Sequence, residues 1–181
     1  YLPSEFTLIS SPRIGFIGAL SQYKLDFDLI LEVAERNPKW NFIFIGPSGD
    51  GESKSDILKF RKLSNIYLLG YRSYQSLPMY CSGFDVAWLP VQINTYTQSM
   101  FPMKFFEYLA SGLPVVATRI NSLKSFKAES FLCEPKAINF EHALSEALEL
   151  KGASLEMRLK LAKDKTYFTR TTEMLKELRS F

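Results

Sequence analysis

Short apolar runs alternate with amphipathic segments through the first 150 residues. Residues 14–19 and 42–45 are continuous apolar runs that end in glycine or small residues, a pattern typical of strands buried on both faces. The stretch between them carries apolar residues at helical spacing, namely Phe27, Ile30, Leu31 and Ala34. Asp26 comes directly before that stretch and suits the N-cap of a helix. A strand, a helix and a second strand are therefore predicted at the start of the chain.

The same alternation continues along the chain. Further strands are predicted at 66–69, 85–89, 115–117 and 131–133. Further helices are predicted at 56–63, 75–81, 102–111 and 140–148, with polar connections at 48–55 and 90–98. This order indicates an α/β fold, here a Rossmann-like doubly wound parallel sheet of about six strands with helices on both faces. Ligands of such sheets bind at the carboxyl ends of the strands, where the strand order reverses.

The segment 101–118 combines a short charged helix with the strand that follows it. Pro102 suits the first turn of a helix, and Gly112 suits the position just past its end. Lys104 and Glu107 are three residues apart, so they share one face near the helix start, where backbone N–H groups and the helix dipole favour an anion. The cation adds to the attraction for phosphate, and the carboxylate accepts hydrogen bonds from a sugar diol. The alternative is an exposed ion pair without a ligand.

Composition bounds the classes of function. At 181 residues, with 46% hydrophobic and 23% charged residues, the chain fits one globular domain. No apolar run approaches the roughly 20 residues that span a bilayer, and the first residues lack a basic, signal-like pattern, so a cytoplasmic location is expected. Cys81 and Cys133 are expected in the core, and His142 falls on the polar side of its helix. Because no metal-ligand cluster stands out, no metal or other cofactor is expected.

Charge is distributed unevenly. Residues 1–150 hold 14 basic and 15 acidic side chains, a net charge of −1, whereas residues 151–181 hold 8 and 4, a net charge of +4. Basic helices that also carry Leu, Met and Phe can lie on an anionic membrane surface or pack on a partner domain, and an ordinary solvated helix is the third alternative. Nucleic acid is not an expected partner, because the body is not basic and has no basic–aromatic surface pattern.

The pattern from Pro102 to Thr118, P-x-K-x-x-E-Y-L-A-x-G-x-P-V-V-A-T, resembles the donor-binding segment of retaining glycosyltransferases of the two-Rossmann-domain (GT-B) type, family 4 or group 1. Other landmarks of that family follow in the expected order, at 14–19, 42–47, 65–70 and 84–90. The resemblance covers roughly residues 12–150. It implies the C-terminal, donor-binding half of an enzyme that transfers a sugar from a UDP- or GDP-sugar to a polysaccharide, glycan or lipid-linked acceptor with retention, and that is inactive alone.

The resemblance also implies a division of the chain. Residues 1–12 would be the remnant of an interdomain linker, and residues 13–152 the nucleotide-sugar-binding domain. Residues 153–181 would form C-terminal helices that pack toward an N-terminal, acceptor-binding domain missing from this chain. This placement would account for the mixed apolar and basic character of the tail, and peripheral contact with the inner face of a membrane is the other possibility.

Residues that would hold the donor diphosphate can be carried over from the family one by one. Gly18 ends the first predicted strand and lets the backbone approach a phosphate closely. The family places an Arg after this glycine and a Lys five residues further on; here these positions hold Ala19 and Lys24. Half of the basic pair is therefore missing. We expect Lys104 to supply the charge that Ala19 lacks.

The family's pair of carboxylates, Glu-x₇-Glu, is also only half present. Glu107 occupies the second position, whose counterpart binds the ribose hydroxyls, but Ser99 occupies the first. Pro102 replaces a glycine of the usual Glu-x-Phe-Gly loop. The resemblance then implies a variant subgroup that contacts the donor sugar through Gln98, Ser99 and the backbone N–H groups from Met100 through Phe101 to Met103.

Tyr71 and Arg72 leave the third predicted strand where the family edges the nucleotide base, mainly through backbone groups. The loop 90–98 is rich in hydroxyl and amide groups that suit sugar hydroxyls, although a merely solvated loop fits as well. Two other functions remain open. One is a non-catalytic nucleotide-binding or scaffolding module, and the other is half of a nucleotide-sugar epimerase, although no His or carboxylate set for proton abstraction is visible.

Overall fold

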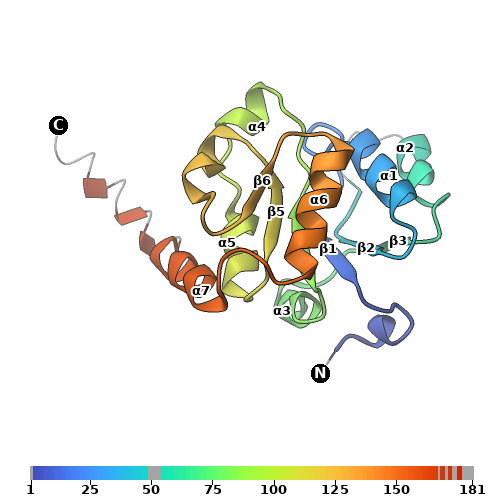
Figure 1. The fold of residues 1–181 in the computed structure, drawn as a ribbon, viewed down its shortest axis with the longest axis horizontal. Coiled ribbons are helices and arrows are strands. Elements are labelled where there is room, and N and C mark those ends of the chain that lie inside the picture. Colours follow the sequence, from blue (N-terminus) through green and yellow to red (C-terminus); the bar gives the residue numbers. More distant parts are fainter. Residues whose placement is uncertain (1, 49–53, 167, 170, 173–174, 177–181) are drawn as a thin grey trace.

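The computed structural model describes residues 2–48, 54–166, 168–169, 171–172 and 175–176. Six parallel strands form one sheet in the order β3-β2-β1-β4-β5-β6 (Figure 1). The strands are β1 (Arg13–Ile17), β2 (Asn41–Ile45), β3 (Ile66–Gly70), β4 (Val86–Leu89), β5 (Val115–Thr118) and β6 (Phe131–Cys133). The predicted doubly wound parallel sheet is confirmed. Most of the polar turn expected at 48–55 lies outside the described residues.

The sheet runs outward in both directions from the adjacent strands β1 and β4. Right-handed crossovers then place the helices of the two halves on opposite faces. The helices are α1 (Phe27–Arg36), α2 (Lys54–Phe60), α3 (Leu77–Cys81), α4 (Thr95–Ser99), α5 (Met103–Ala110), α6 (Ala137–Leu148) and α7 (Leu155–Asp164). After β6 the chain returns as α6, which packs beside α1 and against β4, β5 and β6. Short 3₁₀ helices cover Ser4–Thr7, Tyr74–Ser76 and Asn121–Phe126.

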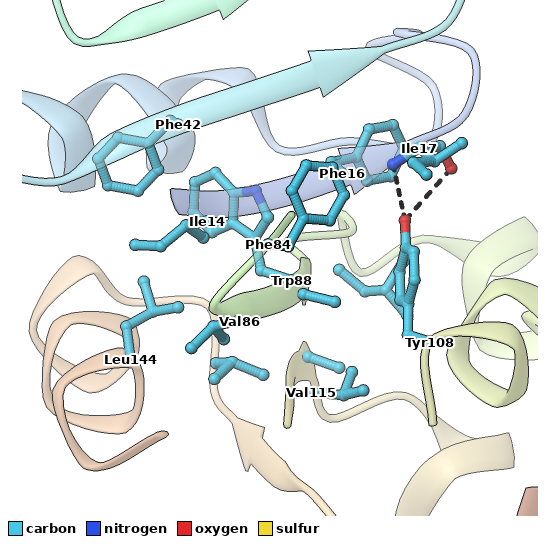
Figure 2. Close-up of a cluster of buried hydrophobic side chains, with 14 of the residues drawn as sticks. Ile14, Phe16, Ile17, Phe42, Phe84, Val86, Trp88, Tyr108, Val115 and Leu144 are labelled. Carbon is cyan, nitrogen blue, oxygen red and sulfur yellow. Dashed lines mark hydrogen bonds between the residues drawn. The ribbon is translucent and has the colours of Figure 1, made fainter. Parts of the chain in front are cut away.

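The core is built from the uninterrupted apolar runs of the central strands. All five residues of β2 and all four of β4 are buried, as the continuous runs in the sequence predict. The ring of Trp88 lies 5.0 Å from that of Phe42 and 5.9 Å from that of Phe44, measured between centroids. Figure 2 shows Trp88 and Phe42 among the buried side chains between Leu144 of α6 and Tyr108 of α5. The two layers of helices thus close over one aromatic core.

Local signals set the ends of α1 and α5. The Asp26 side chain accepts a hydrogen bond from the Leu29 N–H at 3.0 Å, which confirms it as the N-cap of α1. Pro102 is the N-cap of α5 rather than its first helical residue, so the helix begins one position later than predicted. Gly112, with φ of +79°, ends α5 as predicted, in a Schellman motif in which the Leu113 N–H donates to the carbonyl five residues back.

The expectation that 90–98 is an irregular polar loop is wrong in its second half, where α4 forms. Asn94 and Thr97 make a capping box: the Asn94 side chain accepts from the Thr97 N–H at 2.9 Å, and the Thr97 hydroxyl accepts from the Asn94 N–H at 3.0 Å. Two reciprocal hydrogen bonds stabilise a helix that its composition alone does not suggest.

Residues near the N-terminus, assigned to the remnant of an interdomain linker, pack onto the body. Phe6 is 2% exposed and Ile9 is buried, both as part of the main core. The Arg13 guanidinium donates to the Ile9 carbonyl oxygen at 2.7 Å and to that of Phe6 at 3.2 Å. The assignment of residues 1–12 as an interdomain linker stays a prediction, but the segment has a fixed place against the sheet.

Helix α7 is attached to the end of α5. The buried Arg158 guanidinium donates to the Gly112 carbonyl oxygen at 3.0 and 3.2 Å, and it also donates to Ala153. Burial lowers the pKa of Arg158. Leu155, Met157 and Leu159 of the same helix are exposed. No helix among the described residues has both the length and the apolar character needed to cross a bilayer.

Candidate functional site

A cleft of about 490 Å³ lies where the strand order reverses, at the carboxyl ends of β1 and β4. This is the position at which ligands of doubly wound sheets bind. Its walls come from the loops after both strands and from the start of α5. They include seven of the predicted site residues, namely Gly18, Lys24, Met100, Phe101, Met103, Lys104 and Glu107. They also include Tyr74 and Tyr96, which sequence reasoning missed.

Gly18 stands at the floor of the cleft, where three loops approach one another. Its N–H donates to the Ile45 carbonyl oxygen at 2.8 Å, so the loop after β1 extends the pairing with β2. A side chain at Gly46 would place Cβ 2.0 Å from the Gly18 carbonyl oxygen. The absence of that side chain therefore lets the Gly18 backbone settle close to the neighbouring loop, beside the cleft.

Tyr108 positions α5 against the end of β1. Its hydroxyl accepts a hydrogen bond from the Ile17 N–H at 2.7 Å and lies 3.3 Å from the Ile17 carbonyl oxygen (Figure 2). Burial raises the pKa of Tyr108 far above its usual range, so the group is a neutral phenol at physiological pH. The start of α5 and the end of β1 are thus held next to one another by one side chain.

Lys104 and Glu107 face the cleft from the first turns of α5, as the sequence predicts. Lys104 Nζ lies 2.5 Å from Glu107 Oε2, and each side chain is about one-third exposed. Pro102, the N-cap residue, provides no side-chain cap for the helix. The arrangement combines the positive end of a helix dipole, a cation and a carboxylate along one wall, which suits an anion joined to a diol.

Lys24 reaches the same cleft from the loop after β1. Its ammonium nitrogen lies 5.6 Å from the centroid of the Tyr96 ring, within the range of a cation–π contact. Tyr96 in turn lies 5.1 Å from Tyr23, measured between ring centroids. Lys24 and Lys104 therefore bring two positive charges to one cavity, while Ala19, at the position where the resembled family carries an Arg, contributes no charge.

Gln98 and Ser99 do not line this cleft. Ser99 Oγ donates to the Thr95 carbonyl oxygen at 2.9 Å, and Gln98 Oε1 accepts from the Asn121 N–H at 3.0 Å. The Met100 N–H donates to the Tyr96 carbonyl oxygen. These polar groups are engaged within the protein, so the structure brings the side chains of Met100 and its successors, rather than those of Gln98 and Ser99, to the cavity.

Tyr71 and Arg72 also lie outside the walls of the cleft. Tyr71 is exposed. The Arg72 guanidinium lies 2.8 Å from Glu5 Oε1, donates to the Tyr80 hydroxyl at 2.6 Å and donates to the Leu69 carbonyl oxygen at 2.6 Å. The hydrogen bonds from Arg72 and Tyr80 lower the pKa of Glu5 to about 2. Arg72 thus joins the N-terminal segment to the loop after β3.

A smaller cavity of about 200 Å³ lies between α3 and α5. It shares Tyr74, Lys104 and Glu107 with the larger cleft and adds the buried Cys81. Burial raises the pKa of the Cys81 thiol and raises that of Cys133 to about 12. Both cysteines are core residues, as predicted, and they are not activated nucleophiles.

The remaining titratable candidates lie outside the cleft. The His142 side chain is 75% exposed, as expected for the polar side of α6, and its Nδ1 lies 3.6 Å from Glu146. Within the described parts of the chain, no group of three or more His, Cys, Asp or Glu side chains is arranged to hold a metal ion. The chemistry that the described residues offer at the cleft is therefore that of amines, one carboxylate and aromatic rings.

Comparisons with known proteins agree with the fold and the motif. Residues 11–149 match the family model described as glycosyl transferases group 1. A relative from Bacillus subtilis (strain 168), named "Putative teichuronic acid biosynthesis glycosyltransferase TuaH", is 36% identical over 109 residues, which are 60% of this chain and 27% of that protein.

Two solved structures show the same fold. Anabaena HepE in complex with UDP and glucose superposes with a TM-score of 0.76 at 17% identity, covering 97% of this chain and 50% of HepE. Sucrose-phosphate synthase from Thermosynechococcus elongatus gives a TM-score of 0.74 at 16% identity, covering 99% and 49%. The chain thus spans about half the length of these structures and 27% of TuaH. The chain belongs to the glycosyl transferases group 1 family, and its fold is that of the C-terminal domain of the GT-B architecture.

Proposed function

We propose that this domain binds a nucleoside-diphosphate sugar in the cleft between β1 and β4 and contributes to glycosyl transfer with retention. The main support is that Lys104, Glu107 and the loop at Gly18 line one cavity, and that this cavity lies where the strand order of the sheet reverses. UDP is the first nucleotide to test, because the solved structure of HepE holds it in the same fold.

Each group at the cleft has a role in this proposal. The Glu107 carboxylate accepts hydrogen bonds from the ribose hydroxyls. Lys104, Lys24 and the N-terminus of α5 stabilise the diphosphate, whose negative charge grows as it leaves the sugar. Positive charge is already supplied from two walls, so we expect binding that needs no metal ion.

In this proposal Lys104 supplies the positive charge that the wider family draws from an Arg and that Ala19 lacks, while Lys24 keeps the position of the family's own Lys. Ala19 and Ser99 stand where the resembled enzymes carry an Arg and a Glu. A non-catalytic module of the same fold is the alternative that this loss favours, because Ser99 cannot act as a carboxylate. Such a module would bind nucleotide weakly or not at all.

The acceptor would be held mainly by an N-terminal domain, with the described cleft closing against it. A polysaccharide, glycan or lipid-linked acceptor fits this role, and TuaH, named for teichuronic acid biosynthesis, makes polysaccharide the first choice. The exposed apolar side chains of α7, together with the basic charge of the tail, suit either contact with that domain or peripheral contact with the cytoplasmic face of a membrane.

Calorimetric titration of the chain with UDP, GDP and ADP tests the proposal. Saturable binding of one nucleotide, weakened in Glu107→Ala, supports donor binding and identifies the base. If no nucleotide binds, the titration is repeated on a protein that includes both domains, and failure there overturns the proposal in favour of a non-catalytic module. With a two-domain protein, transfer of labelled sugar separates a transferase from an epimerase, and the anomeric configuration of the product tests retention.

A further inference from the structure

Two loops of the cleft rim are joined to one another by hydrogen bonds. One loop follows β1 and the other follows β4. The Gln92 N–H donates to the Lys24 carbonyl oxygen at 2.8 Å, and the Asn94 side-chain amide donates to the Tyr23 carbonyl oxygen at 2.8 Å. The two loops therefore form one fixed structure at the reversal point of the sheet, rather than two independent connections.

Four polar side chains of this rim make hydrogen bonds inside the protein. Thr97 is fully buried, and its hydroxyl donates to the Gln92 carbonyl oxygen at 2.5 Å. Asn94 uses its side-chain oxygen for the capping box of α4 and its nitrogen for Tyr23. Ser99 and Gln98 are bonded to neighbouring backbone groups. The side chains of Asn94, Thr97 and Ser99, and the side-chain oxygen of Gln98, which suited a sugar-binding loop, thus have partners within the protein.

The rim also exposes two aromatic rings, those of Tyr96 and Tyr23. Tyr96 is 41% exposed and lines the cleft, and Tyr23, whose ring contacts that of Tyr96, is 59% exposed. Their ring centroids lie 5.1 Å apart, and Lys24 Nζ lies 5.6 Å from the Tyr96 ring. The two loops that carry these rings are already joined by hydrogen bonds, so little conformational entropy is lost when a ligand stacks on the rings.

The chemistry of this platform suits a pyranose. The electron-rich face of an aromatic ring attracts the weakly positive C–H groups on the flat side of a sugar ring. The adjacent ammonium group of Lys24 attracts a phosphate or carboxylate bonded to that sugar. We infer that Tyr96, whose ring is in contact with Tyr23 and Lys24, is a stacking platform for a hexopyranose ring. This site deepens the proposed donor-binding function and rests on it for its setting.

The pyranose can come from two sources, the sugar of the donor or a sugar of the acceptor. Titrations with UDP and with UDP-glucose separate the sugar contact from the nucleotide contact. For a donor sugar, Tyr96→Ala lowers the affinity for UDP-glucose by about fivefold and leaves that for UDP unchanged, whereas Tyr96→Phe, which keeps the ring, retains both. Phe168→Ala removes an exposed aromatic ring from the C-terminal segment and serves as the matched control, with no effect expected.

A second measurement needs no nucleotide. Saturation-transfer NMR with methyl α-glucopyranoside is expected to show transfer from aromatic protons to the sugar ring in the unmodified protein, in Tyr96→Phe and in Phe168→Ala, and a loss of transfer in Tyr96→Ala. Loss of this signal together with an unchanged ratio of UDP-glucose to UDP affinity identifies the acceptor as the source of the sugar.

The outcomes distinguish this inference from the donor-binding function. If no nucleotide binds, even to a protein that includes both domains, the donor-binding function fails, and the methyl glucoside experiment alone decides whether Tyr96 is a sugar platform. If UDP binds but Tyr96→Ala changes neither the ratio of affinities nor the saturation transfer, the platform is overturned while donor binding stands. Absence of saturation transfer in the unmodified protein, with an unchanged ratio in Tyr96→Ala, also overturns it.

Discussion

The hydroxyl of Tyr108 accepts a hydrogen bond from the backbone N–H of Ile17 at 2.7 Å, so a residue of α5 holds the last residue of β1 in place. Gly18, which follows Ile17 in the chain, lines the cleft. Lys104, one helical turn before Tyr108 in α5, lines it as well. One buried contact therefore sets the spacing between the two main walls of the candidate site.

Removing this hydroxyl is expected to destabilise the fold. Tyr108→Phe leaves the buried Ile17 N–H without its partner, which costs about 1–3 kcal/mol of unfolding free energy. Chemical denaturation followed by circular dichroism measures the effect. Tyr67→Phe, at a half-buried tyrosine of β3, is the control and is expected to change stability less. Equal losses in the two variants would show that the Tyr108 contact has no special importance.

Acid should destabilise the contact between the N-terminal segment and the body. The pKa of Glu5 is lowered from 4.5 to about 2 by Arg72 and Tyr80, so its contribution is fully present above pH 4.5 and is lost as pH falls from there toward 2. The melting temperature of Glu5→Gln should therefore lie below that of the unmodified protein at neutral pH and approach it at low pH. Glu32→Gln, at a more exposed ion pair, is the control. A difference that stays constant across this range would contradict the assignment.

Two glycines at the carboxyl edge should respond differently to the same substitution. Gly46→Ala directs Cβ at the Gly18 carbonyl oxygen, where the backbone cannot yield easily, so we expect a loss above 2 kcal/mol, on the order of a core overpacking mutation. Gly70→Ala meets no atom within 4 Å and costs only the strain of a positive φ, about 1 kcal/mol. Denaturation curves compare the two. A larger loss for Gly70→Ala would show that the close approach at Gly46 is unimportant.

Much of the fold follows from local signals in the sequence. Asp26 was predictable as an N-cap because the polar residue and the apolar spacing that it precedes are adjacent in the chain, and the glycine that ends α5 was predictable for the same reason. The capping box of Asn94 and Thr97 is also local, but it lies in a polar segment where no apolar periodicity marks a helix.

Some features of the site depend on contacts between residues that are far apart in the sequence, and these could not be predicted from local patterns. The segment at Tyr71 and Arg72 was expected to edge the nucleotide base, mainly through backbone groups, and that stays a prediction. The Arg72 side chain pairs with Glu5, 67 residues away in the chain, and nothing local identifies that pairing. The position of Tyr96 against Lys24 and Tyr23 likewise depends on how the loops after β1 and β4 come together. The motif at 102–118 located the cleft, whereas the side chains that complete it required the tertiary structure.

Salt and charge substitutions should reveal the diphosphate contact. Lys24→Gln is expected to weaken UDP binding and to reduce its dependence on ionic strength, because one of two cations at the cleft is removed. Titrations at several salt concentrations, with and without a metal chelator, measure both effects. Lys62→Gln, at an exposed lysine that does not line the cleft, is the control. An unchanged salt dependence in Lys24→Gln would remove Lys24 from the site, and loss of binding on chelation would show that a metal ion is required.

The central claim is that Glu107 binds the ribose of the donor nucleotide. The most direct measurement is calorimetric titration of the unmodified protein and of Glu107→Ala with UDP and with 2′-deoxy-UDP. We expect the unmodified protein to prefer UDP by about tenfold, because a hydrogen bond to a carboxylate is lost with the 2′-hydroxyl. We expect Glu107→Ala to bind both nucleotides equally weakly while keeping its fold. Equal binding of the two nucleotides by the unmodified protein, or a full preference for UDP in Glu107→Ala, would contradict it.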